Sequence, residues 1–258
     1  MAKHQFGLVG KNISYSFSKG FFNEKFQNLN LLLDYSYENL DFQTIEQFPE
    51  YIKQNPSISG LNVTIPYKEA IIPYLDKLSK KAIEIGAVNT IKITKSGKLK
   101  GFNTDYLGFK KSLEPLLNTS HKKALILGTG GASKAIVYAL KQLGISSLFV
   151  SRNAIGDAIG YNQINEKTFE EFHIIINCTP IGTFPNTNSC PEIPYKYFTY
   201  NHIAFDLIYN PAETMFLKKA KDQGAIIKNG FELFDKNGYQ QLINYINSKL
   251  PGKPSFEK

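Results

Sequence analysis

Short apolar runs alternate with amphipathic stretches along the whole chain. Runs rich in β-branched and aromatic residues are typical of strands, whereas apolar side chains that recur every three or four residues indicate helices. The second half of the chain contains five such runs, separated by helical or loop stretches, as a Rossmann-type sheet requires. The runs lie at residues 123–128, 147–151, 172–178, 202–207 and 224–230.

The first half shows the same alternation. Strands are predicted at residues 6–10, 34–40, 59–65, 87–93 and 98–102, and helices at 19–30, at 44–55 and from Lys68 to near Gly86. The stretch 105–117 is amphipathic and leads into the second half, and residues 232–250 are predicted to form a last helix. Alternating strands and helices predict an α/β fold of two α/β units, with βαβ connections and parallel sheets.

Composition and charge narrow the functional classes. The chain has 258 residues, of which 42% are hydrophobic and 20% charged, which is typical of globular proteins and leaves room for two domains. The formal net charge is +8, but the lysines form only short groups, which favours solvated faces and anionic small ligands over nucleic acid. No apolar run approaches the roughly 18 residues of a membrane span, and no export signal is recognisable, so we expect a cytoplasmic protein without a membrane partner. The two cysteines and four histidines show no metal-ligand spacing, and no metal is expected.

A strand, a glycine turn and a helix follow one another in residues 125–140. Gly128 permits the tight turn, Gly130 lets the backbone approach a pyrophosphate, and the amides that begin the helix favour negative charge. The third position of the usual fingerprint is Ser133 rather than glycine. The predicted cofactor contacts in this turn are Gly128, Thr129, Gly130, Gly131, Ala132 and Ser133.

The next predicted strand ends in Ser151 and Arg152, where an NAD-specific site would carry a carboxylate for the ribose hydroxyls. An arginine at this point can pair with the 2′-phosphate of NADP, which a carboxylate would repel. We therefore predict NADP as the cofactor, with Ser151 and Arg152 among its contacts.

Four short polar clusters stand at the predicted strand ends of the first half. They are Ser14-Tyr15-Ser16, Asn62-Val63-Thr64 together with Lys68, Val88-Asn89-Thr90, and Asn103-Thr104-Asp105. Each cluster alone is better explained by turn formation or capping than by a binding site. Their number fits a polyhydroxylated carboxylate, because such a ligand needs many neutral hydrogen-bond partners and a proton donor.

The order and spacing of these segments resemble the shikimate dehydrogenase family. The matching segments are GKNISYSFSK (10–19), GLNVTIPYK (60–68), GAVNT (86–90), GFNTDYLG (101–108), GTGGAS (128–133), NCTPIG (177–182) and DLIYNPAET (206–214). They follow one another in the family's order over nearly the whole chain, which makes the resemblance far more specific than a glycine motif alone.

The resemblance implies the reversible, NADPH-dependent reduction of 3-dehydroshikimate to shikimate, within aromatic amino acid biosynthesis. It implies Lys68 and Asp105 as the catalytic pair, and it adds Thr179 and Gly230 to the cofactor contacts. The implied substrate contacts are Ser14, Ser16, Thr64, Asn89, Tyr209 and Asn237. It also implies a substrate-binding and catalytic domain (1–105 with 236–258), to which the C-terminal helix returns, and a Rossmann NADP-binding domain (106–235).

Several positions depart from the family pattern, and two of them concern the substrate site. Tyr15 stands where the family often has histidine, and Asn237 stands where it typically has a glutamine that reaches the substrate; asparagine is one methylene shorter. Three alternatives stay open: a quinate/shikimate dehydrogenase with broader substrate or cofactor use, a non-catalytic NADP-binding relative, and, last, a nucleic-acid-binding protein. A homodimer is compatible with the sequence, which does not determine the oligomeric state.

Overall fold

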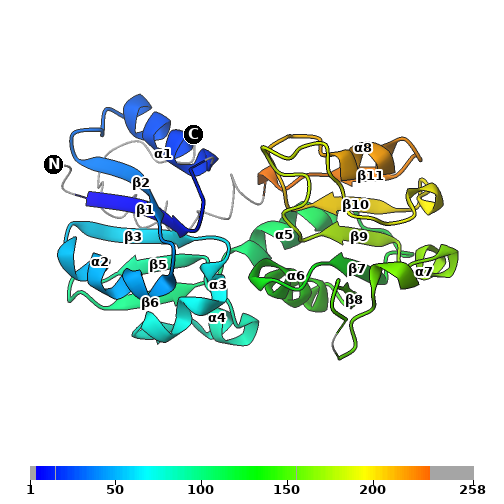
Figure 1. Cartoon of the computed structure of the whole chain (residues 1–258), viewed down its shortest axis with the longest axis horizontal. Helices are drawn as coiled ribbons and strands as arrows, with labels where there is room; N and C mark the ends of the chain where they lie inside the picture. The colour runs from blue at the N-terminus through cyan, green and yellow to red at the C-terminus, as the bar shows by residue number, and fades with distance from the viewer. Residues whose placement is uncertain (1–3, 15, 155, 233–258) are drawn as a thin grey trace. The chain divides into compact units, whose positions relative to one another are not determined.

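The computed structural model describes residues 4–14, 16–154 and 156–232, and these residues form two compact units, one up to Thr104 and one from Asp105 onward (Figure 1). Both units combine a β-sheet with helices, so the predicted α/β class is confirmed. The predicted helix at 232–250 lies almost wholly outside the described residues, as do Tyr15 and Asn237. None of the described helices has the length and apolar character needed to span a bilayer.

The first unit contains a six-stranded sheet in the order β2-β1-β3-β5-β6-β4. Its strands are β1 (His4–Gly10), β2 (Tyr35–Asp41), β3 (Ile58–Val63), β4 (Lys77–Leu78), β5 (Thr90–Ile93) and β6 (Leu99–Phe102). Its helices are α1 (Phe17–Asn28), α2 (Phe48–Gln54), α3 (Tyr67–Ala70) and α4 (Lys80–Ile85), with 3-10 turns at Ile45–Gln47 and Ile72–Tyr74.

The sheet of the first unit is mixed, so the prediction of a parallel sheet is wrong for this unit. β1 runs parallel to β2 and β3, but β5 is antiparallel to both β3 and β6. The reason is the short connection between β5 and β6, where Thr94 and Lys98 close a turn and Gly97 has a φ of 77°. A connection of this length joins strands only as a hairpin.

The helical stretch predicted between Lys68 and Gly86 is also divided. Pro73 lies in a 3-10 turn after α3, and the two residues of β4 then pair with β6 before α4 begins. Proline cannot continue an α-helix beyond its first turn because its ring clashes with the preceding turn and it lacks the N–H group. α4 ends at Gly86, whose φ of 72° is the left-handed conformation that glycine adopts at a helix end.

Helices cover both faces of this sheet. On one face, Phe22 of α1 stacks on Tyr37 of β2 with ring centroids 4.4 Å apart, and both side chains are fully buried. On the other face, Phe48 of α2 and Ile71, which follows α3, pack with Leu61 of β3 in a second apolar cluster. Burial of each such side chain contributes about 1.5–3 kcal/mol.

The second unit contains an all-parallel sheet in the order β11-β10-β9-β7-β8, which confirms the five predicted strands (Figure 1). The strands are β7 (Lys123–Leu127), β8 (Ser146–Val150), β9 (Ile174–Asn177), β10 (Ile203–Asp206) and β11 (Ile226–Lys228). The helices are α5 (Asp105–Leu113), α6 (Gly131–Gln142), α7 (Glu166–Glu171) and α8 (Met215–Lys221), with 3-10 turns at Glu114–Leu116, Tyr161–Gln163 and Tyr195–Tyr197.

This unit has three layers. α5 and α6 pack on one face through Phe109 and Ile136, and α7 and α8 pack on the other through Phe169 and Phe216. Since the central strands are buried on both faces, they consist of continuous apolar runs rather than alternating ones. The strand order reverses at β7, because β8 lies on one side of it and β9 on the other. Ligands of open parallel sheets bind beyond the carboxyl ends of strands at such a reversal.

Candidate active site and nucleotide-binding turn

One edge of the first sheet gathers the predicted polar clusters. The register pairs Asn62 of β3 with Thr90 of β5, and Thr90 with Phe102 of β6. Because β5 is antiparallel to its neighbours, its first residue lies beside the last residues of β3 and β6. Segments that are far apart in the sequence therefore meet at this edge.

The polar side chains at this edge form a buried hydrogen-bonded chain. Asn62 Nδ2 donates to Thr90 Oγ1 (3.5 Å), and Thr90 Oγ1 donates to Asn89 Oδ1 (3.0 Å). Asn89 Nδ2 donates to Thr104 Oγ1 (3.0 Å), and the backbone N–H of Thr104 donates to Asn89 Oδ1 (3.0 Å). Buried amides are costly unless they are bonded in this way, so the chain fixes the position of Asn89.

The segments that carry the predicted catalytic pair are both anchored at residues 88–89. The Lys68 carbonyl accepts a hydrogen bond from the backbone N–H of Val88 (2.7 Å). Asn89 holds Thr104, the residue before Asp105. Lys68 lies half-buried in α3, and Asp105 is buried as the first residue of α5.

Thr64 lies half-buried immediately after β3, and its backbone N–H donates to the carbonyl of Val9 (2.8 Å). The end of β1 approaches Thr64 closely at Gly10. A Cβ atom on Gly10 would lie 2.7 Å from Thr64 Cγ2 and 2.6 Å from Ile13 Cγ2, so the loop that follows β1 requires glycine at this point.

The predicted serines lie in that loop and at the start of α1. Ser16 caps α1, and its hydroxyl donates to the Ser18 hydroxyl over 3.2 Å. Ser18 is buried, whereas Ser14 is exposed. The structure therefore pairs Ser16 with Ser18, a residue that the motifs did not single out, although the spacing of two between hydroxyls at a predicted helix start was visible in the sequence.

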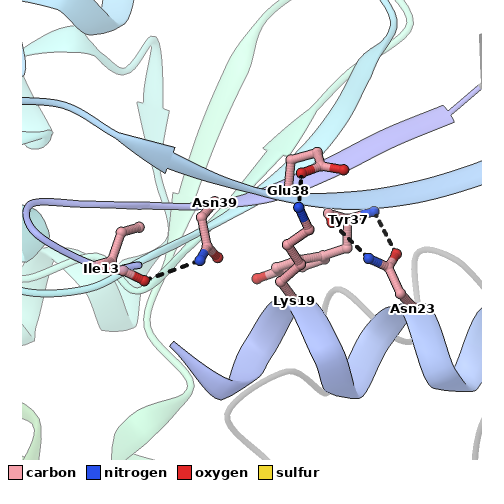
Figure 2. Close-up of polar contacts among 6 residues, drawn as sticks. All are labelled: Ile13, Lys19, Asn23, Tyr37, Glu38 and Asn39. Atoms are coloured by element: carbon pink, nitrogen blue, oxygen red, sulfur yellow. Dashed lines mark hydrogen bonds and ion pairs between the residues drawn. The ribbon is translucent and has the colours of Figure 1, made fainter. Parts of the chain in front are cut away.

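Residues of β2 hold this loop and helix in place (Figure 2). Asn39 Nδ2 donates to the Ile13 carbonyl (3.0 Å). Asp41, which Figure 2 does not draw, accepts from the backbone N–H groups of Asn12 and Ile13 (2.8 and 3.0 Å). Asn23 of α1 makes two hydrogen bonds of 3.1 Å to the backbone of Tyr37.

At the helix end nearer the loop, Lys19 Nζ lies 2.7 Å from Glu38 Oε2, as Figure 2 also shows. Because about half of each of these two side chains is exposed, this ion pair contributes at most about 1 kcal/mol. The paired amide of Asn23 is the more specific anchor between α1 and β2.

The glycine turn of the second unit lies at the point where the strand order reverses. Gly128 follows β7 with a φ of 99°, which disfavours any other residue, and Gly130 is the N-cap of α6. Thr129 and Gly130 are exposed, and Gly131 and Ala132 are half-buried in the first turn of α6, where backbone N–H groups lack intrahelical partners. Ser133 is buried, and its hydroxyl donates to the Gly130 carbonyl (2.7 Å), so this side chain closes the turn.

Thr179 lies beside this turn, in the loop after β9. A Cβ atom on Gly128 would lie 2.9 Å from Thr179 Cγ2, so the two segments are in contact. Beyond β8, Ser151 is half-buried and Arg152 is exposed. No carboxylate occupies residues 151–154, which is the place where an NAD-specific site would carry one.

Tyr209 and Gly230 lie beyond the carboxyl ends of β10 and β11. Tyr209 is half-buried, and the backbone N–H of Gly230 donates to the Ile208 carbonyl (3.1 Å). A Cβ atom on Gly230 would come within 2.1 Å of the Leu207 carbonyl oxygen, so only glycine fits. Within the described ranges, no group of three or more His, Cys, Asp or Glu side chains is arranged to hold a metal ion.

The second unit has a parallel sheet and a glycine turn that suits a phosphate, and the first unit gathers hydroxyl and amide groups at one edge of its sheet. This combination in one chain is typical of two-domain nicotinamide-dependent dehydrogenases. Residues 8–91 match the family model described as the shikimate dehydrogenase substrate binding domain. A Clostridium botulinum (strain Loch Maree) protein named shikimate dehydrogenase (NADP(+)) is 38% identical, over 92% of this chain and 94% of its own length.

Two solved structures of shikimate dehydrogenases have a fold similar to that of this chain. A shikimate dehydrogenase in complex with NADP+ superposes with a TM-score of 0.82 at 31% identity, covering 95% of this chain and 90% of that one. The shikimate 5-dehydrogenase of Thermus thermophilus, in complex with NADP(H) and shikimate, has a TM-score of 0.80 at 28% identity, covering 96% of this chain and 94% of that one. The chain belongs to the shikimate dehydrogenase family, as its motifs indicate.

Proposed function

We propose that this protein catalyses the reversible NADPH-dependent reduction of 3-dehydroshikimate to shikimate. The observation that carries the proposal is the polar edge of the first sheet, where residues 88–89 anchor both the Lys68 segment and Thr104, the neighbour of Asp105. The residue roles implied by the sequence motifs, including Ser14 and Asn237, stay predictions. In this assignment residues 1–105 with 236–258 bind the substrate and 106–235 bind the cofactor.

The glycine turn fits a dinucleotide. A Cβ atom on Gly130 would meet no heavy atom within 4 Å, so the glycine leaves open space at the start of α6, where backbone N–H groups favour a phosphate. Arg152, exposed beyond β8, would pair with the 2′-phosphate of NADP. Thr179 would contact the cofactor from the other side of the turn. When bound, NADPH supplies a hydride to the substrate carbonyl carbon.

Lys68 and Asp105 would carry the proton chemistry. The carbonyl oxygen gains negative charge as its carbon is reduced, and it needs a proton to become a hydroxyl. The Lys68 ammonium can stabilise that charge and donate the proton. Asp105 would orient the ammonium and accept a hydrogen bond from the reacting hydroxyl. In the reverse direction, Lys68 takes the proton back from the hydroxyl of shikimate.

The remaining polar groups would hold the substrate. Ser16 offers a hydroxyl at the N-terminus of α1, where a carboxylate is favoured by the helix dipole, and Ser14 is exposed in the loop before it. Thr64, Asn89 and Tyr209 would bind the ring hydroxyls. Asn89 is well suited to this role, because the buried chain from Asn62 to Thr104 fixes its orientation.

Replacing Lys68 by alanine tests the proposal. With shikimate and NADP+, followed at 340 nm, we expect turnover to fall by ~100-fold or more, because the group that donates and accepts the proton is removed. NADP+ affinity should change little. The matched control is Lys53→Ala, which removes an exposed lysine of α2 in the same unit and should keep the original rate. An unchanged rate in Lys68→Ala would contradict the assignment.

The same assay, together with a measurement of shikimate binding, separates the first two alternatives. Equal rates with quinate or with NAD+ would favour the broader quinate/shikimate dehydrogenase, and shikimate binding without NADPH formation would favour a non-catalytic relative. A cytoplasmic location and a homodimer stay predictions of the sequence; light scattering on a size-exclusion column tests the second.

A further inference from the structure

Asp206 is a fully buried carboxylate at the carboxyl end of β10. Its Oδ1 accepts hydrogen bonds from Asn177 Nδ2 (3.1 Å) and from the backbone N–H of Ile208 (3.0 Å). Its Oδ2 accepts a short bond from Thr214 Oγ1 (2.6 Å). All three donors are neutral. Burying a carboxylate without a cationic partner costs free energy, so the presence of Asp206 at this position needs an explanation.

One donor organises the loop that reaches the glycine turn. Asn177 uses its amide N–H to bind Asp206, which turns its Oδ1 toward Thr179. That oxygen accepts from the Thr179 hydroxyl (2.6 Å) and from its backbone N–H (3.0 Å). The Thr179 hydroxyl in turn accepts from the backbone N–H of Ile181 (3.2 Å). Two hydrogen-bonded steps therefore connect Asp206 to the residue that touches Gly128.

The other donors organise the loop after β10. Ile208 precedes Tyr209, and its carbonyl accepts from the N–H of Gly230. Thr214 closes the loop as the N-cap of α8, where its hydroxyl also accepts from the backbone N–H of Leu217 (3.3 Å). Asp206 thus bonds at once to the strand end before Thr179 and to both ends of the loop that contains Tyr209.

We propose that Asp206 is a positioning residue, which sets Thr179 against the glycine turn through Asn177 and thereby determines how tightly NADP is bound. The inference rests on the proposed function, because it takes the turn and Thr179 as the cofactor site. Asp206 itself is fully buried and touches Asn177, so it acts through that side chain. Burial raises the pKa of Asp206 to about 7, and either protonation state leaves oxygen acceptors for its donors.

Equilibrium binding of NADP+ without substrate, measured by calorimetry, tests the proposal. We expect Asp206→Ala to raise the Kd by about tenfold or more, because Asn177 loses its hydrogen bond to Asp206, keeps only the longer one to the Ile181 carbonyl (3.4 Å), and holds Thr179 less firmly. Asp206→Asn keeps the size and one acceptor, and should restore most of the affinity. Thr214→Val removes one bond to Asp206 and should raise the Kd by about threefold, whereas Thr214→Ser keeps the hydroxyl and should bind like the original protein.

The matched control lies at the opposite end of the same sheet. His202 is buried, donates to the Phe169 carbonyl (2.9 Å) and accepts from the backbone N–H of Thr199 (3.0 Å). His202→Gln should lower the melting temperature without changing the Kd for NADP+. If the Asp206 and Thr214 variants fold, melt at lower temperature and still bind NADP+ with the original Kd, Asp206 is only a structural residue and the proposal is overturned.

The two proposals fail in different ways. An unaltered protein that binds NADP+ but does not oxidise shikimate contradicts the proposed reaction and leaves the effect of Asp206 on Kd measurable. An unaltered protein that does not bind NADP+ overturns both. Normal catalysis with a Kd that is insensitive to Asp206 overturns this inference alone.

Discussion

Tyr37 Oη donates a hydrogen bond of 2.9 Å to Asn62 Oδ1 in the buried interior of the first unit. This bond links two groups of contacts within the unit. On one side, α1 is attached to the Tyr37 backbone by Asn23 and to its ring by Phe22. On the other side, Asn62 begins the hydrogen-bonded chain to Asn89 and Thr104. Tyr37 therefore connects α1, which Ser16 caps, with the segment that precedes Asp105.

Tyr37→Phe should lower both the stability of the protein and its affinity for the substrate. Loss of the hydroxyl leaves Asn62 Oδ1 without this donor, which costs about 1–3 kcal/mol of unfolding free energy. Because Asn62 also orients the Asn89 network, we expect KM for shikimate to rise about threefold or more while KM for NADP+ stays unchanged. Urea unfolding followed by circular dichroism and steady-state kinetics measure the two effects.

Tyr195→Phe is the matched comparison for Tyr37→Phe. Tyr195 Oη donates to the Pro191 carbonyl over 2.9 Å in the second unit, so the substitution also removes one tyrosine hydrogen bond. It should reduce stability and leave KM for shikimate unchanged. Equal effects of both variants on KM would show that the kinetic change follows from general destabilisation and not from the chain of bonds.

Gly130→Ala should separate cofactor binding from stability. Gly130 has φ −75° and ψ 175°, which any residue adopts, and a Cβ atom there would meet no neighbour within 4 Å. The melting temperature without ligand should therefore stay within about a degree of the original value. The added methyl group would occupy the space through which a pyrophosphate approaches the helix, so the Kd for NADP+ should rise about tenfold or more.

Gly144→Ala provides the contrast to Gly130→Ala. Gly144 also has open space around it, but its φ is 71°. Alanine there is strained by about 1–2 kcal/mol, so this variant should lose stability and bind NADP+ normally. A Gly130→Ala protein that binds NADP+ as tightly as the original would show that the cofactor does not use this turn.

The parallel sheet of the second unit could be predicted because its central strands are buried on both faces. Segments such as 123–127 and 174–177 are uninterrupted apolar runs, so their strand character is visible without knowledge of their neighbours. The first sheet was less predictable. β4 is only the pair Lys77–Leu78, which has no strand pattern, and the direction of β5 depends on the turn at residues 94–98.

The site shows a similar division. The order of the motifs indicated the segments around Lys68, Asn89 and the glycine turn, because these segments follow one another in the chain as they do in the family. It assigned no role to Tyr37, nor to Asp206, which begins the matching segment 206–214, because their importance lies in bonds to residues distant in sequence. Tyr35 and Tyr37 look equivalent on an alternating strand, and only the packing of the strands shows that Tyr37 reaches Asn62.

Arg152→Ala should alter the choice between the two nicotinamide cofactors. Arg152 is exposed beyond β8, so its removal should leave the fold intact. A pairing with the 2′-phosphate contributes about 1.5–3 kcal/mol, which corresponds to a rise of about tenfold to a hundredfold in KM for NADP+. KM for NAD+, which lacks this phosphate, should not rise. Lys167→Ala, which removes an exposed lysine of α7 in the same unit, is the control, and equal changes in KM for both cofactors in Arg152→Ala would contradict the assigned role.

Three histidines meet at the amino end of the second sheet. The rings of His121 and His202 are buried and lie 6.5 and 5.3 Å from that of His173. His121 Nδ1 accepts from the backbone N–H of Asn118, and His202 Nδ1 accepts from that of Thr199, so each ring is held in its neutral form. Burial is the main reason that the pKa values of His121 and His202 lie below 6.5, and the neighbouring His173 lowers both further.

These two histidines should make the protein less stable in acid. Because the pKa values of both histidines are lower in the folded state, the unfolded chain binds more protons just below pH 6.5. The unfolding free energy therefore falls as the pH falls through that window. The loss is up to about 1.4 kcal/mol per pH unit for each histidine. Asp206 has a raised pKa in the folded state, so it increases the unfolding free energy as the pH falls. Because the original protein and the variant both contain Asp206, its contribution cancels in the comparison. Between pH 7.5 and 5, His202→Gln should therefore lose less unfolding free energy in urea than the original protein. Equal losses in His202→Gln and the original protein would exclude His202 as a source of the acid sensitivity.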